Sequence, residues 1–383
     1  MKIAEVRPIL VGNPWKNWVF VKVHTDEGIE GLGEASPDNL AQAVEGALRD
    51  IGPMCVGTDP REPSELWERL HKALYLTTDG SALHALAGIE IACLDILGKS
   101  LNKPLHELLG GARRTKIRAY ANGWYQGPRK PEFFAQRAKQ VVALGYSALK
   151  LDPFGAAYGD LSPEEEALSL SIVAAVREAV GDEVHVLVEA HDRFNVHTAI
   201  RVAERLAEYE PTWLETPVNS EDLRALGEVA QRSPVPIAAG ERLRTVTQFR
   251  DMLETTRVRY AQPEPLNLGG ILMALRVAKL VEQHGALMAP HSAQSPVATV
   301  ICTHLDACCD RAFVQETFDD FHVDWARNLF DPYPRIVDGY LEVPNGPGIG
   351  ISLNEEAAAA HPYSHENILP LFEVGWEQRT GRR

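Results

Sequence analysis

The sequence predicts an α/β fold: a (β/α) barrel of the TIM-like type, preceded by an α+β capping domain. Three observations support this fold class. The chain has 383 residues, more than one hydrophobic core usually supports outside a large barrel. From residue 116 onward, short apolar runs alternate with amphipathic helical stretches. Polar residues then follow these runs in regular succession, as they do at the functional face of a barrel.

Composition excludes several classes of partner. The chain is 45% hydrophobic and 24% charged, which is ordinary for a folded chain. Its 38 basic and 53 acidic residues leave a net charge of −15, so we expect no nucleic acid or anionic membrane as partner. No apolar run approaches the roughly 20 residues that span a bilayer, and Glu5, Arg7 and Pro8 interrupt any signal-peptide core. The five cysteines lack CxxC spacing and suit reduced, buried thiols, which favours the cytoplasm.

Residues 1–115 have the pattern of an α+β domain. Alternating runs joined by short turns predict an antiparallel meander, and longer periodic stretches predict helices. The strands are expected at 2–11, 18–25 and 29–34, and the helices at 39–51, 61–75 and 82–100. Gly110-Gly111 marks the end of this domain.

Residues 116–335 carry the barrel pattern. Eight strand-like runs, about 25–35 residues apart, lie at 117–121, 148–153, 184–190, 212–217, 237–241, 259–263, 286–291 and 313–316. Helical stretches such as 131–144, 163–180 and 197–209 lie between them. A doubly wound open sheet is the main rival, but the chain lacks a GxGxxG or GxxxxGK[ST] phosphate turn.

Residues 336–383 are too few for an independent core. We expect loops with one strand at most, folding back onto the capping domain. The basic residues of this tail are expected to be solvated; they are Arg379, Arg382 and Arg383.

Functional groups of a barrel belong at the carboxyl ends of its strands. The residues at those positions are polar, namely Lys150, Asp152, Glu189, His191, Glu215, Glu241, Glu264, His291 and Glu316.

Glu189, Glu215 and Glu241 end three successive runs and are evenly spaced by about one β/α repeat. At equal heights their carboxylates would converge, and each would raise the pKa of the others unless a cation were present. Oxygen ligands favour Mg²⁺ over Zn²⁺. The alternative for any one of them is a salt bridge to an arginine in a loop.

His191 lies two residues after Glu189, and His291 ends a later strand. Two histidines on either side of a carboxylate cluster fit an acid and a base, since histidine titrates near neutral pH. Glu264, on the preceding strand, is placed to orient the His291 imidazole. A single strand-end histidine, by contrast, is more often structural.

Lys150 leaves three alternatives open. It could form a Schiff base, hold a substrate carboxylate, or pair structurally with Asp152 or Glu189. Glu316 could donate a hydrogen bond to developing negative charge if protonated, or it could buttress its neighbours.

Nine motifs together resemble the enolase superfamily, and specifically its mandelate racemase group and acid-sugar dehydratases. The resemblance covers nearly the whole chain. The motifs are TDEGIEGLGEAS (25–36), AGIEIACLDILGKSLNKPLHELLGG (87–111), ALKLDPFG (148–155), VEAHDRF (188–194), WLETPV (213–218), AAGERL (238–243), QPEPLNLGGI (262–271), APHS (289–292) and QET (315–317).

The resemblance implies a role for each matching residue. Glu189, Glu215 and Glu241 match the three Mg²⁺ ligands, and His291 with Glu264 matches the base dyad. His191 matches the acid that protonates the leaving hydroxyl, as in the galactonate dehydratase-like branch. Glu316 matches the acid facing the enolate, and Lys150 the second-strand lysine.

In this family the N-terminal domain covers the barrel and its loops contact the distal end of the substrate. Here these loops fall near 14–18 and 75–80. We expect substrate contacts from Asn17 and Trp18 in the first loop, and from Asp152 and Arg193 on the barrel side.

Several positions depart from the family pattern. Glu189 and Glu264 stand where Asp is common, and Lys150-Leu151-Asp152 replaces the Lys-x-Lys of racemases. The fourth-strand motif is Glu-Thr-Pro rather than Glu-Glu-Pro, and Asp-Arg-Phe follows His191 where Gly-Arg-Phe is common. Every functional group of the pattern is nevertheless present.

The resulting hypothesis is a Mg²⁺-dependent lyase that dehydrates an aldonate or aldarate to a 2-keto-3-deoxy sugar acid. A racemase, epimerase or cycloisomerase acting through the same enolate is the nearest alternative. A Schiff-base aldolase and a non-catalytic sugar-acid binder are the others. The resemblance also suggests a homo-oligomer, between a dimer and an octamer.

Overall fold

Eight parallel strands form a barrel in the computed structural model, which describes residues 1–76 and 79–379. The strands are β4 (Lys116–Ala121), β5 (Ala148–Leu151), β6 (His185–Glu189), β7 (Trp213–Glu215), β8 (Ile237–Ala239), β9 (Tyr260–Ala261), β10 (Leu287–Met288) and β11 (Gln315–Thr317). Each pairs with the next from β4 to β10, and β11 pairs with β4. A parallel bridge from Met288 to Ala312, just before β11, closes the ring. The barrel prediction is therefore confirmed, with all eight runs present as strands.

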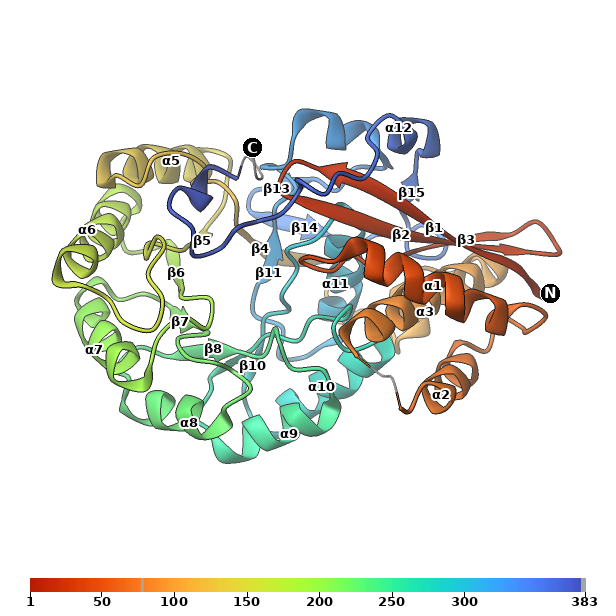
Figure 1. Ribbon diagram of the computed structural model, residues 1–383, viewed down its shortest axis with the longest axis horizontal. Coiled ribbons are helices and arrows are strands. Elements are labelled where there is room, and N and C mark those ends of the chain that lie inside the picture. Colours follow the sequence, from red (N-terminus) through yellow and green to blue (C-terminus); the bar gives the residue numbers. More distant parts are fainter. Residues whose placement is uncertain (77–78, 380–383) are drawn as a thin grey trace.

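Helices surround the strands, because each helix buries one apolar face against the barrel (Figure 1). They are α5 (Pro131–Ala143), α6 (Pro163–Val180), α7 (Val196–Leu206), α8 (Leu223–Arg232), α9 (Val246–Thr255), α10 (Ile271–Gln283) and α11 (Pro296–Cys308), with a 3₁₀ turn at Ala207–Tyr209. Between β11 and residue 330 the described chain forms the 3₁₀ helix Asp324–Asn328 in place of an α-helix, so the repeat is incomplete at its eighth unit. Tyr120, Trp213 and Tyr260 pack together and fill part of the barrel interior.

The N-terminal unit is an antiparallel meander with helices on one face. Its strands are β1 (Ile3–Asn13), β2 (Lys16–Thr25) and β3 (Glu30–Glu34), and its helices are α1 (Ala41–Cys55), α2 (Pro63–Ala73) and α3 (Gly80–Leu101), followed by the short α4 (Leu105–Leu108). A tight turn at Pro14 and Trp15 joins the first two strands, because Asn13 pairs with Lys16.

Helix α3 is long and apolar enough to cross a membrane by length and composition, a feature that the search for apolar runs in the sequence overlooks. Its surroundings are those of a core helix, because 83% of its most apolar window is buried. It packs against β3 and β2, and Gly31 and Gly33 of β3 allow its backbone to approach closely.

Buried acids join the N-terminal unit to the barrel. Glu34 accepts hydrogen bonds from the backbone N–H groups of Ser295 and Ala298 at the start of α11. Glu90 accepts from the backbone N–H groups of Ile271 and Leu272 at the start of α10. Helix N-termini carry unpaired donors and partial positive charge, so these carboxylates fix the cap over one side of the barrel.

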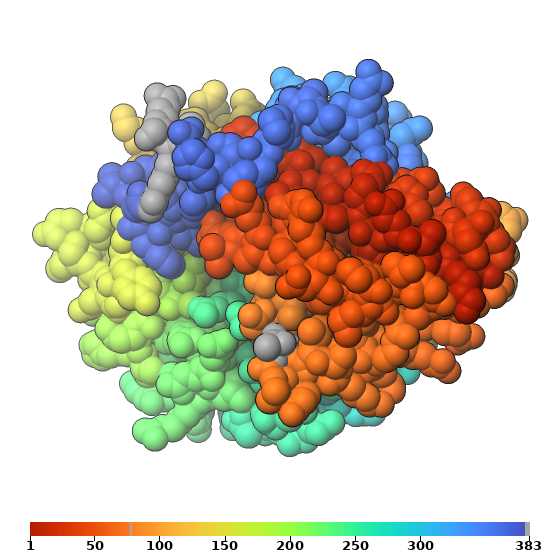
Figure 2. All heavy atoms as spheres, turned by 45° about the vertical axis from the view of Figure 1, so that its right-hand side comes forward, coloured from red at the N-terminus to blue at the C-terminus, as the bar shows by residue number. Residues whose placement is uncertain are grey.

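The C-terminal segment contains more structure than the sequence predicts. Its strands are β13 (Ile336–Val337), β14 (Tyr340–Glu342) and β15 (Ser352–Leu353), followed by helix α12 (Glu355–Ala359) and the 3₁₀ helix Trp376–Gln378; β15 pairs with β12 (Phe330–Asp331), which precedes the segment. β14 pairs with barrel strand β4, whereas α12 packs on β1. Figure 2 shows the final blue stretch lying between the red and orange cap and the yellow-green part of the barrel.

Two predictions about single residue types have different outcomes. All five cysteines are unpaired and buried, as expected. Arg379, however, is only 6% exposed, so the prediction that it is solvated is wrong. Its side chain packs among aromatic rings at the barrel mouth, a location that charge alone does not reveal. Arg382 and Arg383 lie outside the described residues.

Candidate active site

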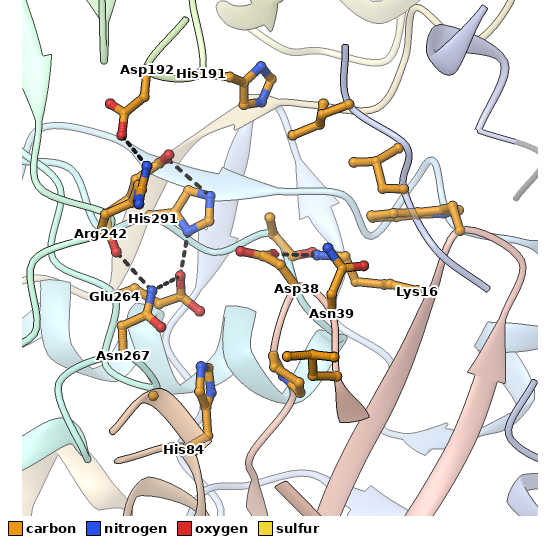
Figure 3. A pocket seen from close by; sticks show the side chains of 18 of the residues that line it. Lys16, Asp38, Asn39, His84, His191, Asp192, Arg242, Glu264, Asn267 and His291 are labelled. Carbon is orange, nitrogen blue, oxygen red and sulfur yellow. Dashed lines mark hydrogen bonds and ion pairs between the residues drawn. The ribbon is translucent and has the colours of Figure 1, made fainter. Parts of the chain in front are cut away.

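A cavity of about 550 Å³ lies where the carboxyl ends of the barrel strands meet the cap and the C-terminal segment. Lys150, His191, Glu241, Glu264 and His291 line its barrel side. Figure 3 shows His191 and His291 facing this space from different strands, with Lys16 and Asp38 of the cap across from them. The cavity therefore lies at the face where barrels carry their functional groups.

The three glutamates converge as the spacing predicts. Glu189, Glu215 and Glu241 each offer a carboxylate oxygen within 4.8 Å of the others. Glu189 and Glu215 end their strands, whereas Glu241 follows Gly240, whose φ of +131° turns the chain after β8. A Cβ at position 240 would lie 2.7 Å from the Phe249 ring, so only glycine fits this turn.

Lys150 binds this carboxylate cluster directly. Its Nζ lies 2.6 Å from Glu215 Oε1, 2.9 Å from Glu316 Oε1 and 3.3 Å from Glu189 Oε2. Although burial opposes the charged form, these carboxylates raise the pKa of Lys150 well above its usual value. Of the pairings considered for Lys150, the one with Glu189 is present, and Asp152 has other partners.

The cluster holds more negative than positive charge. Burial and the neighbouring Glu189 raise the pKa of Glu215 well above normal, and burial raises that of Glu241 to about 7. Five carboxylates surround Lys150 and His291, because Glu264 and Glu316 join the three glutamates here. Acidic groups therefore outnumber basic groups in this cluster. The three-glutamate donor set fits a divalent cation.

His291 forms the predicted dyad with Glu264. Its Nδ1 lies 2.7 Å from Glu264 Oε2, while Nε2 lies 3.5 Å from Glu241. The carboxylate accepts a hydrogen bond from Nδ1–H, so Nε2 is the ring atom that faces the glutamates. Burial opposes protonation, but Glu241, Glu316 and Glu264 raise the pKa of His291 well above its usual value.

His191 is turned toward the cavity by an unusual backbone. His191 and Asp192 have φ angles of +47° and +56°, which side chains other than glycine rarely adopt. The carboxylate of Glu189 accepts a 2.6 Å hydrogen bond from the His191 backbone N–H and holds this turn. Burial lowers the pKa of the imidazole, but Glu189 and a 2.6 Å contact between Nδ1 and Asp152 Oδ2 raise it overall.

Glu316 is an acceptor at both of its oxygens. Oε2 accepts from the backbone N–H of Ser292, and Oε1 accepts from Asn122 Nδ2. Although burial opposes ionisation, Lys150 and His291 lower the pKa of Glu316 to about 2. Of the two alternatives left by the sequence, the geometry favours the buttress, because both Glu316 oxygens already contact donors of neighbouring residues.

Four predicted substrate contacts are absent from the cavity wall. Asp152 and Arg193 are buried beneath it, where they form an ion pair with each other that also positions His191. They are thus positioning residues in this structure.

Asn17 and Trp18 also point away from the cavity. Trp18 is fully buried against His322, Trp325 and Phe330, and Asn17 hydrogen-bonds to the backbone of Ser364. The cavity is lined instead by their neighbours Trp15 and Lys16, because the tight turn between β1 and β2 sets which side chains reach it. From the second expected loop, Gly80 lines the cavity, Tyr75 does not, and residues 77–78 lie outside the described residues.

Other cavity residues carry little sequence signal. They include Asp38, His84, Arg242, Trp376 and Arg379, which come from the cap, a barrel loop and the C-terminal segment. Lys16 donates hydrogen bonds to Asp38 and Gln294, while Arg242 pairs with Asp192. None of these residues ends a barrel strand, so the strand-end rule does not find them.

Comparisons with known proteins agree with this architecture. Residues 134–357 match the family described as "Enolase C-terminal domain-like". Residues 12–110 match "Mandelate racemase / muconate lactonizing enzyme, N-terminal domain". The fold and the cluster of acids at its mouth thus define an enolase-type barrel protein, and the chain belongs to the mandelate racemase/muconate lactonizing enzyme family of the enolase superfamily.

Individual relatives cover most of the chain. D-gluconate dehydratase of Thermoproteus tenax is 36% identical, over 98% of this chain and 77% of the relative. D-gluconate/D-galactonate dehydratase of Picrophilus torridus is 33% identical, over 95% of this chain and 93% of the relative. The crystal structure of a mandelate racemase/muconate lactonizing enzyme from Jannaschia sp. CCS1 is 32% identical, has a TM-score of 0.88, and covers 95% of this chain and 98% of that one.

Proposed function

We propose that this protein is a Mg²⁺-dependent hydro-lyase that dehydrates an aldonate or aldarate to a 2-keto-3-deoxy sugar acid. One observation carries the proposal: two imidazoles line the same cavity, each held by its own carboxylate, with the three-glutamate cluster beside them. The relatives named as gluconate and galactonate dehydratases support the same reaction class.

Glu189, Glu215 and Glu241 would hold the metal ion. When bound, Mg²⁺ supplies positive charge that stabilises the negative charge developing on the substrate carboxylate. Without such stabilisation, a proton next to a carboxylate is far too weakly acidic for an imidazole to remove.

His291 is the proposed base. Glu264 keeps the proton on Nδ1, so Nε2 is the atom available to take the proton from the carbon next to the substrate carboxylate. The electron pair of that C–H bond moves into the carboxylate-stabilised enolate.

His191 is the proposed acid. Asp152 contacts its Nδ1 and favours the protonated ring, so Nε2–H can donate to the hydroxyl on the next carbon. The C–O bond then breaks, water leaves, and the remaining enol rearranges to the 2-keto-3-deoxy acid.

The structure weighs against the two roles that would make Lys150 a reacting group. A racemase base or a Schiff-base amine must be uncharged and free to approach substrate. Lys150 instead donates to Glu189, Glu215 and Glu316 and is only 2% exposed.

The reaction is tested by incubating the protein with D-gluconate, D-galactonate and the corresponding aldarates, with Mg²⁺ or with EDTA. We expect 2-keto acid formation with Mg²⁺ and its loss in EDTA. An epimerised sugar acid without keto product, formed in ²H₂O, would show that the enzyme is an epimerase instead.

The two histidines should separate the half-reactions. His291→Asn is expected to lower turnover about 10²–10⁴-fold and to abolish exchange of the C2 proton with ²H₂O. His191→Asn is expected to lower dehydration by a similar factor while C2 exchange persists, because the base is intact. NMR of the recovered substrate measures exchange, and keto acid formation measures turnover. Wild-type dehydration by His191→Asn would refute the assigned acid.

We also propose a cytoplasmic location and a homo-oligomeric state for this enzyme. The five unpaired thiols favour a reducing compartment. Light scattering of the purified protein measures the oligomeric state, and a monomer would contradict that proposal.

A further inference from the structure

Arg379 is a buried cation at the wall of the cavity. It is 6% exposed and follows directly after the final 3₁₀ helix. Three aromatic rings surround its guanidinium carbon, with centroids 5.1 Å away at Trp15, 5.3 Å at Tyr125 and 5.0 Å at Phe318. The cap, the barrel and the C-terminal segment thus all contribute to its position.

Not every hydrogen-bond donor of the Arg379 guanidinium has an acceptor. Nη2 donates to the hydroxyl of Tyr125 at 3.3 Å, whereas Nε has no acceptor. Among residues 1–76 and 79–379, no carboxylate forms an ion pair with it; Arg193, the other buried arginine of this region, pairs with Asp152. Burying a cation without acceptors is costly, so a molecule in the cavity that offers oxygen atoms would be bound favourably.

Arg379 lies on the side of the strand ring opposite the three glutamates. Phe318 directly follows β11, and Gly123 follows β4; a Cβ at position 123 would lie 3.2 Å from Arg379 Nη1. Glu189 and Glu215 end β6 and β7, Glu241 follows β8, and β7 faces β11 across the eight-stranded ring. Arg379 and Glu241 line the same cavity, so a ligand held at the glutamates has Arg379 on the opposite side of the strand ring.

The backbone that carries Arg379 is fixed in place. Trp376 Nε1 donates a 3.0 Å hydrogen bond to the carbonyl oxygen of Gly155, and the backbone N–H of Arg379 donates to the carbonyl oxygen of Trp376. The Trp376 ring also packs edge-on against His191 at 5.9 Å. The C-terminal segment thus contacts the proposed acid, His191, through Trp376 and contributes Arg379 to the cavity wall.

We propose that Arg379 binds the oxygen atoms at the end of the substrate remote from the reacting carboxylate and so determines which sugar acids the enzyme accepts. This inference rests on the proposed function. The oxygen atoms are those of the terminal hydroxyls in an aldonate or of a second carboxylate in an aldarate.

The test compares substrates that reach Arg379 with one that does not. D-gluconate, D-glucarate and the four-carbon L-threonate are assayed with wild type, Arg379→Gln and Arg379→Lys, with Mg²⁺ present. Calorimetry measures Kd, and keto acid formation measures kcat and KM. The control is Arg327→Gln, since Arg327 also lies over a ring, Tyr333, but is 52% exposed and is absent from the cavity wall.

For Arg379→Gln we expect Kd and KM of six-carbon acids to rise about 10–100-fold, with kcat changing less, and threonate binding to stay unchanged. For Arg379→Lys we expect Kd and KM of the six-carbon acids to lie between those of wild type and Arg379→Gln, because lysine keeps the charge but lacks the planar guanidinium. A larger loss for glucarate identifies a carboxylate as the preferred distal group, and a larger loss for gluconate identifies hydroxyls.

The inference would be overturned if the Arg379 variants bound four-carbon and six-carbon acids with equal losses of affinity, or with no loss of affinity for either. Six-carbon acids that bind wild type without turnover, and bind the Arg379 variants more weakly, would refute only the dehydratase reaction. If wild type binds none of these acids, both proposals fail. Melting temperatures of all variants distinguish weakened binding from misfolding, and Arg379→Lys preserves the test if Arg379→Gln does not fold.

Discussion

Buried carboxylates occur in two regions of this molecule, and their surroundings differ. At the barrel mouth, Glu189, Glu215 and Glu241 lie together. At the joint between cap and barrel, Glu34 and Glu90 lie apart, each at the N-terminus of a barrel helix. Both groups are nearly or fully inaccessible apart from Glu241, so burial alone does not separate them.

The donors around each acid make the difference. Glu34 accepts four hydrogen bonds, from Ser36 Oγ, Ser295 Oγ and the backbone N–H groups of Ser295 and Ala298. At the mouth, Glu189 and Glu215 instead share Lys150, Glu241 lies 3.5 Å from His291 Nε2, and the charge of Glu189 raises the pKa of Glu215. Helix N-termini supply donors to the joint acids, whereas the crowding of carboxylates at the mouth fits the proposed Mg²⁺ ion.

The largest effect should come from breaking the mouth cluster. Glu215→Gln removes one ligand oxygen and one negative charge, so we expect kcat/KM to fall by about 10³-fold or more and Mg²⁺ binding to weaken. Stability without metal should hold or rise, because the change relieves repulsion between carboxylates. Calorimetric Mg²⁺ titration and melting curves in EDTA measure both. Unchanged Mg²⁺ affinity would contradict the assignment of Glu215 as a ligand.

A smaller effect, on stability, should follow from Glu34→Gln. Its amide would direct N–H groups at donors that now face an oxygen, so we expect a loss of about 2–3 kcal/mol in the free energy of unfolding. Turnover of the folded enzyme should be nearly normal. Urea unfolding measures the loss, with Glu204→Gln on the exposed side of α7 as control. Equal stability of the two variants would show that the helix contact at α11 contributes little.

The third effect is confined to the pH dependence of stability and concerns Glu90. Burial raises its pKa to about 8 in the folded protein, against about 4.3 when unfolded. The raised pKa favours the folded state at low pH, and this contribution is lost as pH rises from about 4.3 through 8, by at most about 1.4 kcal/mol per pH unit. Glu90→Gln, which does not titrate, should flatten this decline. Urea unfolding at pH 5, 7 and 9 measures the free energy of unfolding of both proteins. If this free energy changed with pH in the same way in wild type and variant, the raised pKa of Glu90 would be contradicted.

Much of the barrel side of the site could be predicted from the sequence. Strand-end positions recur once per β/α unit, so the spacing of Glu189, Glu215 and Glu241 places them at one height on neighbouring strands. The same rule brings Glu264 to His291. These contacts follow from the repeat, because parallel strands in register carry their ends to one face.

The rest of the cavity could not be predicted in this way. Trp18 was expected at the cavity and lies in the core, because the turn at Pro14 and Trp15 decides which side chains of that hairpin point inward. Asp152 and Arg193 were expected to touch substrate but lie beneath His191, because the left-handed turn at His191 raises the imidazole above them.

The sequence by itself determined the fold class, the ring of strand-end acids and the histidine dyad, because a repeating unit converts linear spacing into position. Only the tertiary structure decided how the far wall is built, where the cap, the barrel and the last described residues bring Trp15, Phe318 and Arg379 together. Those residues are distant in sequence and follow no common period. Their meeting depends on how three separately formed parts pack, which local sequence patterns do not encode.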